Sequence, residues 1–372
     1  MPLFQPDTTY PAIPAADGIA VVTGDFNGDG RQDAAMSTTG HVLVYLQNAD
    51  GSLAAPVSYE ASTYAISLAT GDLNHDGRTD IVAGDFISNT ISIYLQKADG
   101  SLASRVSYPS GIQPDAVTVG DLNDDGLDDV AVSHWNTASV GVFPQNSAGT
   151  LNAMQSYPAP LAGYDDIAIG DVNGDGLNDI VKMNGLNSVP RLSVYLQVYE
   201  GTLAGPVPFD INCTGDCSPG GLGIGDVTGD GRADVVVSYG GIAPTSNIAV
   251  FAQGSDGRLQ APAAYLAHDV PESLKLADID LDGRTDLVVA HGYWGDGFSF
   301  YPQPLSSGYS FFALPHLGSY YEPEALSVAD LNNDGLPDVV VAGAGGLSVS
   351  YRNNVPPIII APTAVPMASP TP

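Results

Sequence analysis

The stretch "GDLNHDGRTDIVAG", residues 71–84, decides the fold of this chain. Asp72, Asn74 and Asp76 stand at alternate positions, a glycine follows them, and Asp80 ends the acidic part. Glycine permits a sharp backbone turn, and the apolar, β-branched run after Asp80 is typical of a strand. The stretch therefore predicts an acidic loop of nine residues between two strands.

This acidic loop recurs seven times in the 372 residues of the chain. The first aspartates of successive loops are 47 to 55 residues apart. Such a period indicates repeated supersecondary units, which must be recognised before domains are drawn. The acidic loops, numbered one to seven, are 25–33, 72–80, 121–129, 171–179, 226–234, 278–286 and 330–338.

Each repeat predicts four short strands. In the second repeat an alternating run at 65–70 precedes the loop, "DIVAG" follows it, and a third strand ends in "IYLQ" at 93–96. A glycine-bearing turn and the strand "VSYP" at 106–109 complete the unit. Short strands with turn signals in every repeat predict an all-β fold, a seven-bladed β-propeller with four antiparallel strands per blade.

The two ends of the chain together supply one blade. The last repeat has no fourth strand after "SYRN" at 350–353, whereas "FQPDTTYPA" at 4–12 matches the fourth-strand pattern. We expect this N-terminal strand to close the ring, because closure removes an open edge. The propeller then spans residues 1–355, and the Pro-rich segment 356–372 is either a linker or a disordered terminus.

The acidic loops have the donor set of a calcium site. Side chains at positions 1, 3, 5 and 9 and the backbone carbonyl of position 7 are all oxygen donors, and hard oxygen ligands in a flexible loop suit Ca²⁺. We expect up to seven Ca²⁺ ions. The expected ligands are Asp25, Asn27, Asp29, Arg31, Asp33, Asp72, Asn74, Asp76, Arg78, Asp80, Asp121, Asn123, Asp125, Leu127, Asp129, Asp171, Asn173, Asp175, Leu177, Asp179, Asp226, Thr228, Asp230, Arg232, Asp234, Asp278, Asp280, Asp282, Arg284, Asp286, Asp330, Asn332, Asp334, Leu336 and Asp338.

Other readings of the acidic loops are weaker. Asp, Asn and Gly form turns without any metal, but a bare turn does not require three convergent carboxylates in every copy. An EF-hand carries an acidic residue at position 12, and no copy has one there. Loop five departs from the pattern at Thr228, while loop six, with Asp280 at position 3, is expected to hold Ca²⁺ most firmly.

The pattern D-x-[ND]-x-D-G-x-x-D between two strands resembles the FG-GAP or VCBS repeat family, which includes the seven-bladed propeller of integrin α-subunits and many bacterial surface proteins and lectins. The resemblance covers about residues 4–355 and implies the propeller fold and calcium loops. The "FG" and "GAP" dipeptides are poorly kept, since this chain has "VAGD" and "VAGAG" in the equivalent region. No integrin partner or ligand-binding mechanism is therefore transferred.

The face opposite the acidic loops is the predicted ligand face. Loops between strands two and three, and between blades, emerge there and carry aromatic residues beside Asn, Asp and His, which suits sugars or peptides. Aromatic residues near strand ends also commonly only cover a core. The expected ligand-binding residues are His134, Trp135, Tyr239, Tyr293, Trp294 and Tyr321.

Charge and composition limit the function classes. The formal net charge is −31, so nucleic acid is not an expected partner, and no apolar stretch is long enough to insert into a membrane. The six histidines are scattered and no nucleophile elbow, phosphate loop or HExxH motif is present, so we expect no enzyme, although a polysaccharide-acting enzyme stays an alternative. A purely structural surface domain is the other alternative to a glycan- or protein-binding module.

The expected location is the cell exterior. The first residues show no basic stretch followed by an apolar one, so this expectation rests on chemistry: extracellular calcium modules bind at about 0.1 to 1 mM. Cys213 and Cys217 are the only cysteines. No histidine lies nearby at the spacing of a zinc finger to complete a zinc site with them. We expect a short disulfide between them, with two free thiols as the alternative.

Overall fold

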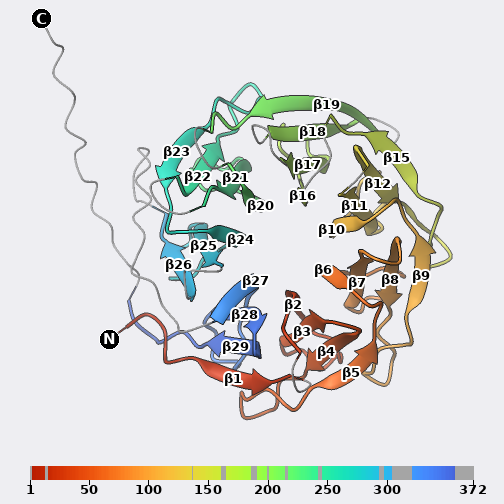
Figure 1. Cartoon of the computed structure of the whole chain (residues 1–372), viewed down its shortest axis with the longest axis vertical. Coiled ribbons are helices and arrows are strands. Elements are labelled where there is room, and N and C mark those ends of the chain that lie inside the picture. The colour runs from red at the N-terminus through yellow and green to blue at the C-terminus, as the bar shows by residue number, and fades with distance from the viewer. Residues whose placement is uncertain are drawn as a thin grey trace, which may run out of the picture.

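The computed structural model describes residues 2–12, 16–135, 137–160, 165–185, 191–198, 201–213, 217–241, 245–292, 297–303 and 321–356. Seven antiparallel sheets are arranged in a ring around a central channel, and Figure 1 views the ring along the channel. In six of the sheets the strand nearest the channel comes first in the chain, whereas in the seventh sheet the N-terminal strand lies on the outside of the ring. The predicted all-β, seven-bladed propeller is confirmed.

The strands of each blade follow one another along the chain. Blade one contains β2 (Ala20–Gly24), β3 (Asp33–Thr38), β4 (His41–Tyr45) and β5 (Val57–Glu60). Blade two contains β6 (Ala65–Gly71), β7 (Asp80–Asp85), β8 (Thr90–Tyr94) and β9 (Val106–Pro109). Blade three contains β10 (Pro114–Gly120), β11 (Asp129–His134), β12 (Ser139–Phe143) and β15 (Gln155–Pro158), with the small hairpin β13 (Gln145–Asn146) and β14 (Thr150–Leu151). Blade four contains β16 (Asp165–Gly170), β17 (Asp179–Asn184), β18 (Arg191–Val198) and β19 (Thr202–Asp210).

The second half of the ring repeats this order. Blade five contains β20 (Pro219–Gly225), β21 (Asp234–Tyr239), β22 (Asn247–Phe251) and β23 (Ala263–Leu266). Blade six contains β24 (Pro271–Ala277), β25 (Asp286–His291) and β26 (Gly297–Tyr301), and the residues just after it lie outside the described ranges. Blade seven contains β27 (Tyr321–Ala329), β28 (Asp338–Ala344), β29 (Gly346–Ser350) and β1 (Thr8–Pro11).

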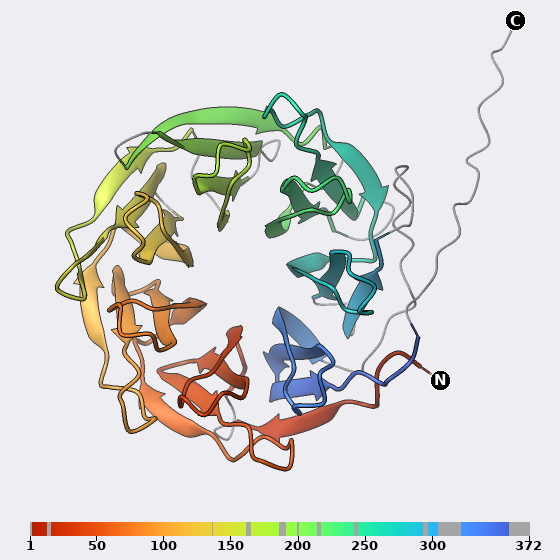
Figure 2. The ribbon, with the colours of Figure 1, turned by 180° about the vertical axis from the view of Figure 1, so that it is seen from behind.

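The N-terminal strand closes the ring as predicted. β1 pairs antiparallel with β29, with Thr8 opposite Val349 and Pro11 opposite Gly346. Figure 2, from behind, shows the same closure beside blade one. Upstream of β1, Phe4 forms a bridge with Arg352, and its ring packs edge-on against Phe298 of blade six at 5.3 Å. The predicted Pro-rich tail lies almost wholly beyond the described residues.

The core is divided among the joints of the ring. Seven clusters of buried apolar side chains occur, and each combines residues of two neighbouring blades. The second strand of every blade, such as β7, is buried along its whole length, because it has a neighbouring sheet on both faces. This explains the continuous β-branched runs after the acidic loops, since strands buried on both faces lose the polar alternation. Blade-to-blade packing therefore holds the ring together.

Two further structural facts concern the cysteines and the helix content. The Sγ atoms of Cys213 and Cys217 are joined at 1.98 Å with their Cα atoms 5.9 Å apart, which is ordinary disulfide geometry. The described residues include no helix long and apolar enough to cross a membrane.

Candidate metal loops and ligand cavity

Each acidic loop curls around its first aspartate. In loop two the Oδ1 atom of Asp72 accepts the N–H of Asp76 at 2.9 Å, and its Oδ2 atom accepts the N–H of Gly77 at 2.8 Å. Position 6 is a left-handed glycine in all seven loops, a conformation that glycine adopts without steric strain. Position 4 is left-handed too, even where it is His75 or Leu281. Non-glycine residues held there indicate that the surrounding contacts, and not glycine alone, impose the loop shape.

The aspartate at position 9 has a structural task of its own. In loop two Asp80 is fully buried, its Oδ2 atom accepts the N–H of Leu73 at 3.0 Å, and its Oδ1 atom accepts the N–H of Gln96 at 2.7 Å. Equivalent bonds recur in every loop. Burial raises the pKa of Asp80 to about 7 in the metal-free chain, against the lowering effect of these bonds. Position 9 therefore joins the acidic loop to the residue that follows the third strand through hydrogen bonds that need no metal.

Position 7 contributes more than the backbone carbonyl that the sequence predicts. Arg31, Arg78, Arg232 and Arg284 form ion pairs with the position 5 aspartates Asp29, Asp76, Asp230 and Asp282 of their own loops. In loop two the Arg78 Nε atom also donates to the backbone oxygen of Gln96 at 3.0 Å. In loops three, four and seven position 7 is leucine. The arginine loops thus have their position 5 carboxylate partly neutralised by the chain itself.

Loop six fits a hard cation best. Asp278, Asp280 and Asp286 form a group of three carboxylates, the one such group of possible metal ligands among the described residues, with ligand oxygens all within 4.8 Å of one another. Because three anions this close repel one another, a divalent ion would stabilise the arrangement, and an all-oxygen donor set suits Ca²⁺. In the other loops position 3 is Asn or Thr, so fewer carboxylates converge. The carboxylates of loop six fit calcium, and the expectation that this loop binds it most firmly stays a prediction.

Every acidic loop is also fastened to the next blade. Its position 2 side chain enters the apolar cluster shared with that blade, as Phe26 does between blades one and two. In five loops a glutamine that follows the next blade's third strand then donates to the loop, as Gln96 Nε2 does to the backbone oxygen of Asp25 at 2.9 Å. A side chain on Gly100, in the following turn, would meet the backbone oxygen of Asn27 at 2.8 Å. One loop is therefore clamped by the core, an amide and a turn of its neighbour.

Sequence reasoning noticed these glutamines but gave them no role. Bonds of this kind also join Gln47 to Asp330, Gln145 to Asp72, Gln253 to Asp171, and Gln303 to Asp226. In blade seven Arg352 takes the same place and donates to the backbone oxygen of Asp280 at 3.0 Å. On loop three Asn178 Nδ2 of the next blade donates to the backbone oxygen of Asp121 at 3.0 Å instead. The signal was present, because the glutamine follows the third-strand aromatic residue at a fixed spacing in six repeats. The backbone oxygen that accepts this hydrogen bond could not be predicted, because it belongs to the acidic loop of another repeat.

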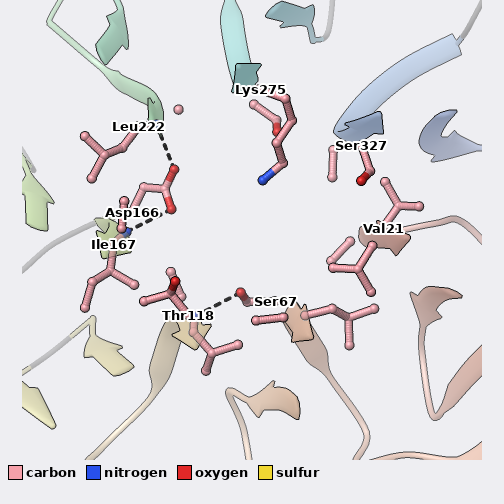
Figure 3. A pocket seen from close by; sticks show the side chains of 18 of the residues that line it. Val21, Ser67, Thr118, Asp166, Ile167, Leu222, Lys275 and Ser327 are labelled. Carbon is pink, nitrogen blue, oxygen red and sulfur yellow. Dashed lines mark hydrogen bonds between the residues drawn. The ribbon is translucent and has the colours of Figure 1, made fainter. Parts of the chain in front are cut away.

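The inner strands of all seven blades enclose a central cavity of about 940 Å³. Figure 3 shows side chains from different strands directed into it, including Asp166 and Lys275. The Asp166 carboxylate accepts the N–H groups of Leu222 and Ile167, both at 2.8 Å. Burial nevertheless raises the pKa of Asp166, while the Lys275 charge lowers it. The cavity wall is therefore polar and charged.

An aromatic trio lines one side of the cavity, at the end opposite the acidic loops. Tyr64 precedes β6, and Phe86 and Trp135 follow the second strands β7 and β11. The Tyr64 and Phe86 ring centroids are 6.4 Å apart, and those of Phe86 and Trp135 are 5.9 Å apart, both edge to face. Tyr64 is 41% exposed. Aromatic groups from three connections of blades one to three thus form one surface at the channel mouth.

Two of the predicted ligand residues are buried, so their predicted exposure is wrong. The His134 side chain is fully buried, and its Nε2 atom accepts the N–H of Gly111 at 3.0 Å because the connection between blades two and three covers it. Burial lowers its pKa. Tyr239 is 3% exposed and belongs to the core between blades four and five. Strand ends in this ring are covered by the next blade's connections, which a single repeat does not reveal.

The other predicted ligand residues have different outcomes. Trp135 lines the central cavity as part of the aromatic trio. Tyr293 and Trp294 lie outside the described residues, and only the backbone of Tyr321, at the start of β27, is described. Sequence reasoning missed Tyr64 and Phe86, whose signal was an aromatic residue beside the ends of inner or second strands in blade two only.

Carboxylates line another part of the same cavity. Glu272 on β24 and Glu324 on β27 both line it. Burial, and secondarily the Glu324 charge, raise the pKa of Glu272 to about 7. Asp115, near the start of β10, also lines the cavity, but on blade three, the blade that carries Trp135. The cavity therefore combines an aromatic wall with an acidic wall.

A model of the FG-GAP-like repeat matches the chain five times, at residues 25–83, 76–132, 121–181, 226–289 and 278–341. The chain belongs to the FG-GAP-like repeat family. The resemblance inferred from the acidic loops is thereby confirmed. In this FG-GAP-like propeller the first three matches overlap in sequence, and so do the last two, because each runs from one acidic loop into the second strand of the following blade.

Solved structures share the propeller fold at low sequence identity. BBS1N, in complex with ARL6DN, matches with a TM-score of 0.64 and 12% identity over 95% of this chain and 97% of that one. A lectin of Agrocybe aegerita, described as recognising non-reducing terminal N-acetylglucosamine, matches with a TM-score of 0.56 and 17% identity. The match covers 89% of this chain and 86% of the lectin chain. Sqt1 of Saccharomyces cerevisiae matches with a TM-score of 0.57 and 12% identity, over 92% of this chain and 96% of the Sqt1 chain. No curated protein sequence matches this FG-GAP-like chain.

Proposed function

We propose that this FG-GAP-like propeller is a calcium-stabilised binding module of the cell exterior, and that its glycan or protein ligand binds at the cavity mouth opposite the acidic loops. The observation that carries the proposal is the aromatic trio of Tyr64, Phe86 and Trp135 at the mouth of a cavity of about 940 Å³. Cavities of this size with aromatic walls and a few polar groups are the usual form of ligand sites.

Similar folds support a binding role. BBS1N is described in a complex with another protein, and the Agrocybe aegerita protein as a lectin. Both show that a ring of this shape can serve recognition, and neither names the ligand of this chain. We propose a binding protein rather than an enzyme, because the carboxylates that recur in every repeat are accounted for by loop geometry and metal binding.

Two observations support the exterior as the place of action. The Cys213–Cys217 disulfide is of a kind that persists in oxidising surroundings. Oxygen-ligand loops of this length in extracellular modules fill at about 0.1 to 1 mM Ca²⁺, which is a concentration of the exterior. The net charge of −31 favours cations over anionic surfaces.

A glycan array, combined with capture of soluble proteins from the same exterior, tests the proposal. The full chain with about 2 mM Ca²⁺ is compared with Trp135→Ala and with Leu266→Ala, an apolar residue 69% exposed on β23, away from the cavity. The proposal expects ligand signals that Trp135→Ala abolishes and Leu266→Ala leaves intact. Equal signals from both variants, or no ligand of either kind, would reject it.

A further inference from the structure

The two walls of the central cavity differ in chemistry, and together they restrict its ligand. The aromatic trio belongs to blades two and three, whereas Glu272 and Glu324 belong to blades six and seven. All five residues line one cavity. A ligand that uses the whole site must therefore offer an apolar face at one end and a group that satisfies carboxylates at the other.

Glu272 is the lining carboxylate that a positively charged group would stabilise most. Its carboxylate packs close to Gly292, where a side chain would come within 2.9 Å of its Oε1 atom. Among the described residues the Glu272 carboxylate forms no hydrogen bond and no ion pair, and the charge acting on it is that of Glu324. Lys275, three residues further along β24, acts on Asp166 instead. A half-buried carboxylate beside a like charge is stabilised by a cation.

Hydroxyl groups also line the cavity, on the inner strands of blades one, two, three and seven. Thr23, Ser67, Thr118 and Ser327 come from four different inner strands. Ser67 already accepts the N–H of Val117 at 3.1 Å, and Thr23 and Ser327 bond each other at 3.0 Å, but a hydroxyl oxygen can form further hydrogen bonds. A polyhydroxyl ligand suits this lining better than the aliphatic stem of a lysine side chain does.

We propose that the central cavity binds a short amine-bearing oligosaccharide, whose ammonium group pairs with Glu272 and whose sugar rings pack against the aromatic trio. This inference rests on the proposed function and specifies its ligand. Pyranose faces stack on aromatic rings, and an ammonium group near such rings gains a further cation–π attraction. The acidic field of the whole protein attracts a cationic sugar.

Calorimetric titration of the full chain with calcium tests the inference with three probes: the β-1,4-linked glucosamine trimer, its fully N-acetylated form, and trilysine. We expect the glucosamine trimer to bind about tenfold more tightly than the acetylated trimer, the factor of a charge-assisted hydrogen bond of about 1.5 kcal/mol. Glu272→Gln should remove this difference. Glu60→Gln, a substitution of an exposed glutamate on β5, is the matched control and should not change it.

Each other outcome overturns the inference in a defined way. Equal affinity for both trimers, or a Glu272→Gln variant that still prefers the amine, rejects the pairing of ammonium with Glu272. Tighter binding of trilysine rejects the sugar and favours a basic peptide. Failure of both trimers to bind rejects this ligand class, while the proposed function is judged separately by its array and capture experiment. A thermal melt of Glu272→Gln confirms that the variant is folded.

Discussion

The two faces of this propeller follow opposite rules. On the loop face every blade repeats one arrangement, with an aspartate at positions 1, 5 and 9 of each loop. On the other face the blades differ at equivalent places. The residues six positions before each loop, at or near the start of the inner strands, are Ile19, Ile66, Asp115, Asp165, Gly220, Glu272 and Glu324.

This difference separates what builds the ring from what distinguishes ligands. A contact that every blade must make, such as the amide of Gln96 on the Asp25 carbonyl, is useful only if it repeats. A ligand without sevenfold symmetry requires a surface that breaks the repeat, as the aromatic trio and Glu272 do. The loop face is therefore expected to control stability, and the cavity mouth to control binding.

Calcium provides the largest test of this division. At about 5 mM Ca²⁺ and a dissociation constant of about 0.1 to 1 mM, each filled loop adds about 1 to 2 kcal/mol to the free energy of unfolding. Summed over the loops, the melting temperature should rise by on the order of 10 °C relative to chelated protein. Scanning calorimetry measures the shift, and calorimetric titration measures the number of ions. An unchanged melt in calcium would contradict the metal role of the loop face.

Two aspartates of one loop should differ in their effects. Asp80→Ala removes the acceptor of two buried backbone N–H groups, so even without calcium it should cost about 3 kcal/mol. Asp76→Ala removes a partly exposed ion pair with Arg78 and should cost less than about 1 kcal/mol without calcium.

Urea denaturation in chelator measures both costs, and a titration should find one fewer Ca²⁺ ion bound in each variant. Equal costs in chelator would show that position 9 has no role apart from metal. A full complement of ions in Asp76→Ala would remove position 5 from the ligand set.

The clamp between blades can be weakened alone. Gln96→Leu removes the hydrogen bond to the Asp25 carbonyl, at 2.9 Å, and leaves that oxygen under an apolar side chain. We expect a loss of about 1 to 2 kcal/mol and faster amide exchange in loop one, which belongs to the preceding blade. Gln155→Leu, on the exposed outer strand β15, is the control. Exchange that increases only within blade two would argue against the clamp.

The smallest expected effect lies at the cavity mouth. Because the pKa of Glu272 is raised to about 7 from 4.5, the folded chain holds this proton more tightly than the unfolded chain does. The free energy of unfolding should therefore fall as pH rises from about 4.5 to 7, and Glu272→Gln should remove that part of the fall.

Allowing for partial solvent screening, we expect Glu272→Gln to exceed the parent by about 1 kcal/mol at pH 8 and to match it near pH 4.5. Urea denaturation with calcium at both pH values measures this. Glu324, the charged neighbour of Glu272, is present in both proteins. If the two pH profiles run parallel, Glu272 does not titrate in this range.

Much of the fold followed from one repeat because its signals are local. The loop residues, the β-branched second strand and the "IYLQ" ending lie within about fifty residues of one another. Ring closure was equally predictable, because the last repeat lacks a fourth strand and residues 4–12 supply a strand of that pattern. The two pair in the structure. The burial of His134 and Tyr239 could not be predicted in the same way, because the groups that cover them come from the adjoining connection or blade.

Sequence by itself determined the number of blades, their closure and the oxygen-donor loops, since period, strand pattern and turn residues act over short stretches of chain. Only the tertiary structure decided that Gln96 holds the loop of the preceding blade, and that Tyr64, Phe86 and Trp135 share a cavity with Glu272. The physical reason is that curvature of the ring brings together side chains as far apart in the sequence as Thr23 and Ser327. The pattern within one repeat does not predict such contacts between blades, because they depend on how seven sheets pack around one channel.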